Sequence, residues 1–336
     1  MDLQQSLVAL FCCITLPALA TDITGAGASF PYPLYSKWAE TYRAKTGVKV
    51  NYQSIGSSGG LKQIKEKTVS FAASDYPLKY EDLQNEGLIQ FPAIIGGVVP
   101  IVNITGVKPG QLRLTGLVLA DIFMGEIVRW DDPRIQLLNP ELKLPPKPIT
   151  VVHRADGSGT TAVFVDYLSK VSSKWKNTIG AGPTVKWLAD SSIGGKGNEG
   201  VASTVRRINN TVGYVEYSYI KKNNLSHIQL LNSNGNFVQP SDAGFSAASA
   251  GTDWTKIPGM GAFITNATGE KSWPITAASF ILLYKNSDNH AASAEVLRFF
   301  DFGFQHGQAI ARSLDYVPLP DSTTEFIRKS VWNQVQ

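Results

Sequence analysis

Short apolar runs along the chain alternate with segments in which apolar residues recur every three to four positions. The first pattern is typical of buried β-strands and the second of amphipathic helices packed on a sheet. Strands are predicted at 48–53, 71–74, 94–103, 150–153, 211–217 and 280–284. Helices are predicted at 34–46, 60–67, 117–123, 161–170, 200–208 and 291–306. This alternation favours the α/β class.

Two proline-containing extended segments, 91–95 and 273–276, each lead into an apolar strand. If they run side by side, residues 21–95 and 274–336 form one lobe and residues 96–273 form the other. The chain is then expected to be a two-lobed α/β protein with two hinge crossings. Such an arrangement is able to close over a ligand.

The N-terminus has a different pattern from the rest of the chain. Residues 6–19 are almost wholly apolar, and Ala18-Leu19-Ala20 is a small-x-small cleavage signal before Thr21. The apolar run is too short for a retained membrane anchor. Residues 1–20 are therefore predicted to be a cleaved secretory signal peptide, although the segment before the apolar run contains Asp2 and no Lys or Arg.

Composition narrows the function classes. The 336 residues are 43% hydrophobic and 17% charged, which is typical of a globular protein. The net charge of +4 comes from scattered Lys and Arg residues, so an anionic ligand is compatible and nucleic-acid binding is not favoured. Both cysteines, Cys12 and Cys13, lie in the predicted signal peptide, and a chain without thiols beyond it suits the periplasm. No His, Asp or Glu cluster has metal-ligand spacing, so neither a metal nor a cofactor is expected.

Three turns of small residues each come directly before a predicted helix. They are Gly25-Ala26-Gly27-Ala28-Ser29-Phe30-Pro31, Ser57-Ser58-Gly59-Gly60 and Arg154-Ala155-Asp156-Gly157-Ser158-Gly159-Thr160. Each offers an oxyanion free backbone N–H groups at a helix start, hydroxyl donors and little side-chain bulk. One such turn is more simply explained as a helix cap. Three of them, one containing an Arg, predict an anion site.

Two carboxylates sharpen this prediction. The Arg154 guanidinium can bind a tetrahedral anion with two N–H groups, and Asp156 can hold that guanidinium in place. Asp75 follows the predicted strand at 71–74, where a binding carboxylate could lie. A surface turn or helix cap is an equally good interpretation of Asp75 from the sequence alone.

These runs, together with Ser54-Ile55-Gly56 before the second turn and Ala73-Ser74-Asp75, closely resemble the periplasmic phosphate-binding proteins of phosphate ABC transporters. The resemblance continues through residues 96–99, 129–132, 194–198, 213–217 and 273–276, and so covers nearly the whole chain after residue 20. It implies a monomeric protein that holds inorganic phosphate between two lobes and delivers it to transmembrane permease subunits. The implied ligand contacts are Ser29, Phe30 through its backbone, Ser57, Asp75, Arg154, Ser158, Gly159 and Thr160, with Asp156 in support.

Two details bear on that implied ligand. The family usually has Thr at the position of Ser29, and the hydroxyl is kept here. A carboxylate beside an anion is repulsive unless the anion brings a proton. Phosphate carries a proton near neutral pH and can donate it to Asp75, whereas sulfate cannot. Asp75 is therefore expected to reject sulfate.

Other interpretations remain open beside this one. Gly56-Ser57-Ser58-Gly59-Gly60 fits the nucleophile motif of α/β-hydrolases with Ser58 as nucleophile, but the sequence around His153, His227, His290 or His306 marks none of them as its base. The run 195–200 fits G-x-G-x-x-G, but residues 190–192 before it are predicted to be loop, which disfavours a dinucleotide site. A binding protein for sulfate or molybdate and a phosphatase are the remaining alternatives. The chain is expected not to be an enzyme.

Overall fold

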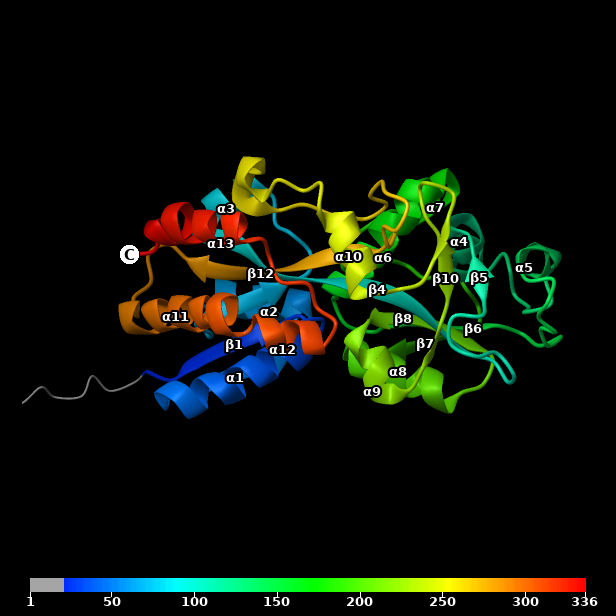
Figure 1. Ribbon diagram of the computed structural model, residues 1–336, viewed down its shortest axis with the longest axis horizontal. Helices are drawn as coiled ribbons and strands as arrows, with labels where there is room; N and C mark the ends of the chain where they lie inside the picture. The colour runs from blue at the N-terminus through cyan, green and yellow to red at the C-terminus, as the bar shows by residue number, and fades with distance from the viewer. Residues whose placement is uncertain (1–20) are drawn as a thin grey trace, which may run out of the picture.

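The computed structural model describes residues 21–336 as an α/β protein of two lobes (Figure 1). The predicted signal peptide, residues 1–20, lies outside the described residues. No helix in the described part has both the length and the apolar character that crossing a bilayer requires.

The first lobe, on the left of Figure 1, contains both ends of the described chain. Its sheet has the order β2-β1-β3-β12-β4. These strands are β1 (Ile23–Gly27), β2 (Val50–Ser54), β3 (Phe71–Ser74), β4 (Leu88–Asn103) and β12 (Thr276–Tyr284). The helices of this lobe are α1 (Tyr32–Thr46), α2 (Ser57–Lys65), α3 (Tyr80–Asn85), α11 (His290–His306), α12 (Gln308–Ser313) and α13 (Asp321–Phe326), followed by the short helices η3 (Ile327–Val331) and η4 (Trp332–Gln334).

The second lobe continues the same sheet from β4 in the order β4-β8-β6-β7. Its strands are β6 (Thr150–Arg154), β7 (Ser192–Gly195), β8 (Thr211–Glu216) and β9 (Ser226–His227), and a small separate sheet contains β5 (Arg113–Leu114), β10 (Gln229–Leu231) and β11 (Phe237–Val238). Its helices are α4 (Gly116–Met124), α5 (Pro133–Leu138), α6 (Gly159–Val171), α7 (Ser173–Thr178), α8 (Gly197–Arg207) and α9 (Ser218–Asn223), with α10 (Asp242–Ser249) close to the junction of the lobes.

Strand β4 belongs to both lobes. Its first part, residues 88–97, pairs with β12, and its last part, residues 98–103, pairs with β8. Of the two segments expected to run side by side, residues 91–95 lie on β4 and pair with residues 278–281 of β12, whereas residues 273–276 lead into β12, where Thr276 is opposite Gly97. Pro92 is accommodated because the register shifts between Ser279 and Phe280, and a bulge of this kind tolerates a residue without an N–H.

The division of the chain into residues 21–95 plus 274–336 and residues 96–273 stays a prediction. It assigns the short helices η1 (Trp254–Lys256) and η2 (Pro258–Met260) to the second lobe. These two helices contact α3, α13 and β4, which places them against the first lobe. The indole of Trp254 also packs edge-on against Phe280 of β12.

The turn predicted at residues 25–31 is shorter than expected, because Ile23–Gly27 forms strand β1 between β2 and β3. Glycine is rare in strands, so the pattern gave no strand signal here. A Cβ atom on Gly25 would lie 2.2 Å from the Phe71 ring, and one on Gly27 would lie 2.0 Å from the Ala73 carbonyl oxygen. The glycines therefore permit the close approach of β1 and β3.

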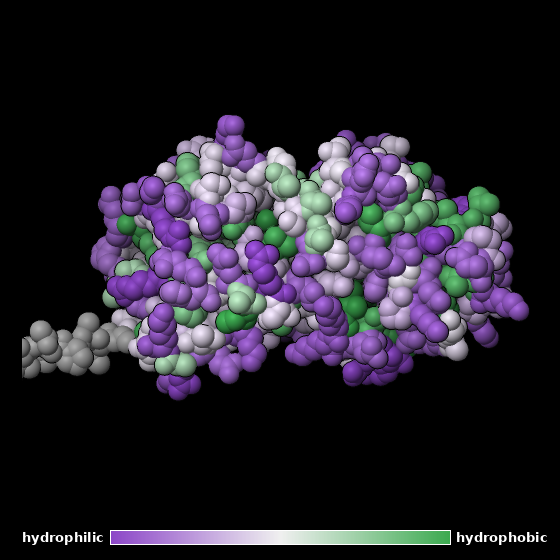
Figure 2. All heavy atoms as spheres, in the orientation of Figure 1, coloured by the Kyte–Doolittle hydropathy of each residue, from purple (hydrophilic) through white to green (hydrophobic). Residues whose placement is uncertain are grey.

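The surface of both lobes is mostly polar in the view of Figure 2. The exposed large apolar side chains among the described residues are Tyr80, Leu117, Val128, Leu137 and Leu188, of which Leu137 is 82% exposed. The buried apolar residues, in contrast, form one cluster that extends through both lobes and a smaller one under α2 and α3.

Candidate functional site

The N-terminal ends of four helices meet where the two lobes touch. Ser29 and Phe30 precede α1, Ser57 is the first residue of α2, and Ser158 caps α6 by accepting a hydrogen bond from the Thr161 N–H. The fourth helix is α8, which begins at Gly197. Helix N-termini carry partial positive charge, so their convergence favours an anion.

Direct hydrogen bonds join the two lobes at this point. The Ser57 hydroxyl of α2 accepts from the backbone N–H of Gly159 on α6 at 3.0 Å. The Thr160 hydroxyl of α6 donates to Asp75, which follows β3, at 3.4 Å. The Tyr219 hydroxyl of α9 donates to the Ser29 carbonyl at 2.7 Å. The structure thus brings the sequence-predicted site residues together.

Arg154, the last residue of β6, supplies a buried positive charge. Its side chain is 1% exposed, and its Nε and Nη2 atoms donate to the two carboxylate oxygens of Asp156 at 2.8 and 2.5 Å. Burial works to raise the pKa of Asp156, but the guanidinium outweighs it and holds that pKa below its ordinary value. The Nη1 atom is also buried and has no hydrogen-bond partner among residues 21–336. A buried N–H donor without an acceptor is costly, so this atom calls for an anionic ligand.

Asp75 is a buried carboxylate within the same cluster. Ser279 of β12 donates to its Oδ1 at 2.8 Å, and Thr160 donates to its Oδ2. Burial raises the pKa of Asp75 to about 7, while Ser279, the Arg154 charge and Thr160 pull that pKa in the opposite direction. Asp75 is therefore poised to exchange a proton near neutral pH. The surface-turn interpretation of Asp75 is wrong, because the residue is 1% exposed.

Three further residues of the cluster, Ser279, Asn198 and Tyr214, were not assigned individual roles from the sequence. Ser279 is a polar residue in an otherwise apolar buried strand, and that contrast was the available signal. Asn198 contacts both Ser29 and Thr160. The Tyr214 hydroxyl accepts from the Arg154 backbone N–H and bonds to Thr161, and thereby fixes the end of β6.

A second buried carboxyl, Glu216 at the end of β8, lies beside the site. Its Oε2 atom accepts from the Ser218 N–H and from the Tyr316 hydroxyl of the first lobe, the latter at 2.9 Å. Burial raises the pKa of Glu216 to about 8, although the Ser218 hydrogen bonds oppose this. The Tyr316 hydroxyl also lies 2.6 Å from the Phe30 carbonyl oxygen, so its single proton is shared between that oxygen and Glu216, and the contact links this carboxyl to the turn before α1.

The hydrolase interpretation has no geometric support in residues 21–336. Ser58 is exposed on α2, and no histidine hydrogen-bonds to it. The His153 ring bonds to the Arg154 carbonyl and stacks on Trp187, and the His227 ring bonds to Gln239. Within the same range, no group of three or more His, Asp and Glu side chains is arranged to hold a metal ion.

The loop predicted at residues 190–192 before the run 195–200 is confirmed at residues 190 and 191 and wrong at Ser192, where strand β7 begins. Strand β7 leads directly into α8, parallel to β6. Strand β7 has only four residues, lies at the sheet edge and begins with an exposed residue. It therefore lacks the apolar run that predicts a buried strand. The N-terminus of α8 is occupied by protein groups, since the Gly197 N–H donates to Asp156 at 3.0 Å and the Asn198 N–H donates to Ser29.

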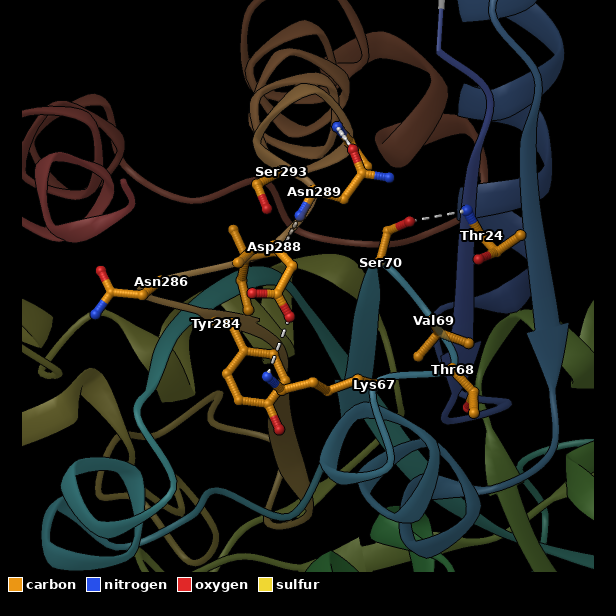
Figure 3. A pocket seen from close by; sticks show the side chains of 13 residues that line it. Thr24, Lys67, Thr68, Val69, Ser70, Tyr284, Asn286, Asp288, Asn289 and Ser293 are labelled. Atoms are coloured by element: carbon orange, nitrogen blue, oxygen red, sulfur yellow. Dashed lines mark hydrogen bonds and ion pairs between the residues drawn. The ribbon is translucent and has the colours of Figure 1, made fainter.

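A pocket at the outer end of the first lobe shares no residue with this site (Figure 3). It lies between the turn after α2 and the chain between β12 and α11. Its polar groups pair with each other: Lys67 faces Asp288 at 3.5 Å, and the Thr24 N–H donates to Ser70 at 3.4 Å. The ion pair is well exposed, so this pocket lacks the buried, unpaired donor found at Arg154.

The fold and the site together define a two-lobed solute-binding protein, with the candidate site between the lobes. A family model described as the PBP superfamily domain matches residues 16–302. The phosphate-binding protein PstS of Haemophilus influenzae is 58% identical over 319 residues, covering 95% of this chain and 95% of that protein. PstS of Xylella fastidiosa is 51% identical over 308 residues, covering 92% of this chain and 84% of its own length. This chain belongs to the family of PstS phosphate-binding proteins.

A solved structure shares the fold. It is that of the high-affinity periplasmic phosphate-binding protein PfluDING, bound with phosphate at pH 8.5. The two sequences are 21% identical, and the match covers 92% of this chain and 94% of the PfluDING chain, with a TM-score of 0.74.

Proposed function

We propose that this protein binds inorganic phosphate between its two lobes and delivers it to the transmembrane permease subunits of a phosphate ABC transporter. The observation that carries the proposal is the buried Arg154 guanidinium, whose Nη1 has no partner among residues 21–336. Membership of the PstS family supports phosphate as the anion. The phosphate contacts we propose are Ser29, Phe30, Ser57, Asp75, Arg154, Ser158, Gly159 and Thr160, with Asp156 orienting Arg154.

Asp75 favours phosphate over other oxyanions. A buried carboxylate needs a donor, and a protonated phosphate oxygen supplies one. Sulfate and molybdate bring no proton near neutral pH and leave Asp75 facing an unpaired negative charge. Sulfate or molybdate binding is therefore the weaker candidate function for this site.

Titration of ligand-stripped protein with phosphate, sulfate and molybdate by calorimetry tests the proposal. We expect phosphate to bind most tightly. Tighter binding of sulfate or molybdate would assign the site to that anion. No heat with any of the three would overturn the proposed function.

We also propose that the protein is not an enzyme. The exposed Ser58 without a base supports this, as does the family of binding proteins to which the chain belongs. Incubation with a chromogenic phosphate ester should release no product. Sustained turnover that Ser58→Ala abolishes would reverse this conclusion.

We further propose that the protein works in the periplasm as a monomer after cleavage behind Ala20. The apolar run and the small-x-small signal support cleavage at that point. N-terminal sequencing of the exported protein should begin at Thr21, and light scattering should give the mass of one chain. Retention of Met1 or a dimer mass would contradict the respective statement.

A further inference from the structure

The orientation of the Asn198 side chain is fixed by its hydrogen bonds. Asn198 is fully buried at the start of α8, and its Oδ1 accepts from the Glu216 backbone N–H at 2.9 Å. A backbone N–H can only donate, so the oxygen of the amide must face β8. The Nδ2 group therefore points the other way, toward the site.

Both protons of that Nδ2 group are engaged. It donates to the Ser29 hydroxyl oxygen at 2.9 Å and to the Thr160 hydroxyl oxygen at 3.2 Å. Asn198, in the second lobe, therefore binds the Ser29 hydroxyl of the first lobe and the Thr160 hydroxyl of its own lobe. Since the accepting lone pair of Thr160 faces Asn198, its proton is free to point to Asp75, as the structure shows.

The Ser29 hydroxyl accepts a second hydrogen bond, from the backbone N–H of Asn198 at 3.0 Å. A hydroxyl has two acceptor positions and one donor proton. Asn198 fills both acceptor positions, so the only function left to Ser29 is donation. Among residues 21–336, the Ser29 hydroxyl donates to no other side chain or backbone group.

Ser57 shows the same arrangement independently. Its hydroxyl oxygen accepts from the N–H groups of Gly159 at 3.0 Å and Asp75 at 3.3 Å. Two serines in the site are thus forced into the donor role by N–H groups around them. A ligand that presents acceptor atoms to the Ser29 and Ser57 hydroxyls fits these two donors. A ligand that presents donor groups to the same hydroxyls does not.

We propose that Asn198 is a positioning residue that determines specificity: it fixes the Ser29 and Thr160 hydroxyls as donors, Ser29 toward the bound anion and Thr160 toward Asp75. The inference rests on the proposed function, since it needs an anion at Ser29. Gly197 supports the placement of Asn198, because its N–H is bound by Asp156, which also holds Arg154.

The decisive substitution is Asn198→Asp, which keeps the shape of the side chain and removes both donors. Ser29 and Thr160 are then free to donate to the new carboxylate instead, and phosphate affinity should fall by roughly a hundredfold or more. Asn198→Ala removes the donors without adding charge and should weaken binding less, by roughly tenfold or more. Asn198→Ala decides the question if Asn198→Asp does not fold.

Asn139 provides the matched control. It is equally buried, and its amide also makes three hydrogen bonds, to backbone groups of Arg113 and Ile135, outside the site. Asn139→Ala should lower thermal stability and leave phosphate affinity of the folded protein unchanged.

A double-mutant cycle separates positioning from a general structural role. In a Ser29→Ala background, Asn198→Ala should weaken phosphate binding far less than it does in the native background, because the hydroxyl it orients is gone. Equal losses in both backgrounds would overturn the inference, as would native affinity in the Asn198 variants. If the unmodified protein does not bind phosphate at all, the proposed function fails and this inference fails with it.

Discussion

The two ionisable side chains at the centre of the site have opposite roles. Arg154 is held in one orientation by Asp156 and offers a free N–H to the ligand. Asp75 accepts from Ser279 and Thr160, and burial places its pKa at about 7. We propose that the first attracts any oxyanion, whereas the second discriminates between anions that carry a proton and anions that do not.

Replacing Arg154 with Ala should weaken phosphate binding by about 2–5 kcal/mol, because a buried charge-assisted donor is lost and Asp156 loses its partner. Calorimetry on the purified variant measures this loss. Arg134→Ala is the control, since Arg134 pairs with Asp121 and Asp132 on the surface of the second lobe. Unchanged affinity in a folded Arg154→Ala protein would show that the anion binds elsewhere.

Asp75→Asn should lower the ratio of the sulfate to the phosphate dissociation constant, because Asn removes the repulsion and can turn its NH₂ toward an unprotonated oxygen. In the native protein, sulfate should bind more tightly as the pH falls through about 7, where Asp75 becomes protonated and able to donate. The Asn variant should lose this pH dependence.

Titrations with sulfate at pH 5.5 and 8.5 and with phosphate at one pH, all at constant salt, measure both effects. The exposed carboxylate Asp288 provides the control variant, Asp288→Asn, which should behave as the native protein. A ratio that Asp75→Asn does not change would mean that selectivity has another source.

At the scale of elements, the sequence pattern missed strands β1 and β7, and strands β4 and β12 begin six and four residues before their predicted starts. Strand β3 matches the prediction, but α2, α6 and α8 each begin two or three residues earlier than the apolar periodicity indicated. Glycine and serine have low helix propensity, so these first turns carried no helical signal. They form because neighbouring groups satisfy their N–H groups, as Ser57 does for Gly159.

The residues proposed to contact the ligand stay predictions, which rest on the family resemblance and on local runs of small and polar residues. Ser279, Tyr219 and Asn198 could not be assigned roles in this way. Their importance comes from contacts between segments far apart in the chain, such as the bond from Ser279 to Asp75. Periodicity and local motifs hold no information about such pairs.

Strand β8 ends in a buried carboxyl that should make stability depend on pH. The pKa of Glu216 is raised from an ordinary 4.5 to about 8, so the folded state holds its proton more tightly than the unfolded state between these values. The free energy of unfolding is therefore expected to fall as the pH rises from about 4.5 to 8, by about 1.4 kcal/mol per unit of pKa shift as an upper bound.

Urea unfolding at pH 5 and at pH 8.5 measures this decrease. Glu216→Gln should reduce it, because the amide carries no charge at either pH. Asp75 contributes in the same direction between 3.8 and about 7, so Asp75→Asn serves as the companion variant. An identical decrease in the native protein and Glu216→Gln would exclude Glu216 as its source.

At the scale of the whole molecule, the candidate site is built from residues of both lobes. Ser29, Ser57 and Asp75 come from the first lobe, and Arg154, Gly159 and Thr160 come from the second. Contacts such as that between Ser57 and Gly159 cross between them. A ligand that touches both sets favours the closed arrangement over any open one.

Small-angle scattering should therefore show a smaller radius of gyration with phosphate than in ligand-stripped protein. The Arg154→Ala variant, titrated in parallel at the same phosphate concentration, should compact less. An equal radius of gyration with and without phosphate, in protein shown to be stripped and to bind, would argue against hinge closure.

The position of β12 in the sheet has a consequence for the order of assembly. This strand, residues 276–284, lies between β3 and β4, which are made near the start of the chain. The sheet of the first lobe therefore cannot be completed until more than four fifths of the polypeptide has been synthesised. Until then, β3 and β4 both lack the strand that lies between them in the finished sheet. A late-closing sheet of this kind suits a polypeptide that must be threaded through a membrane while still unfolded.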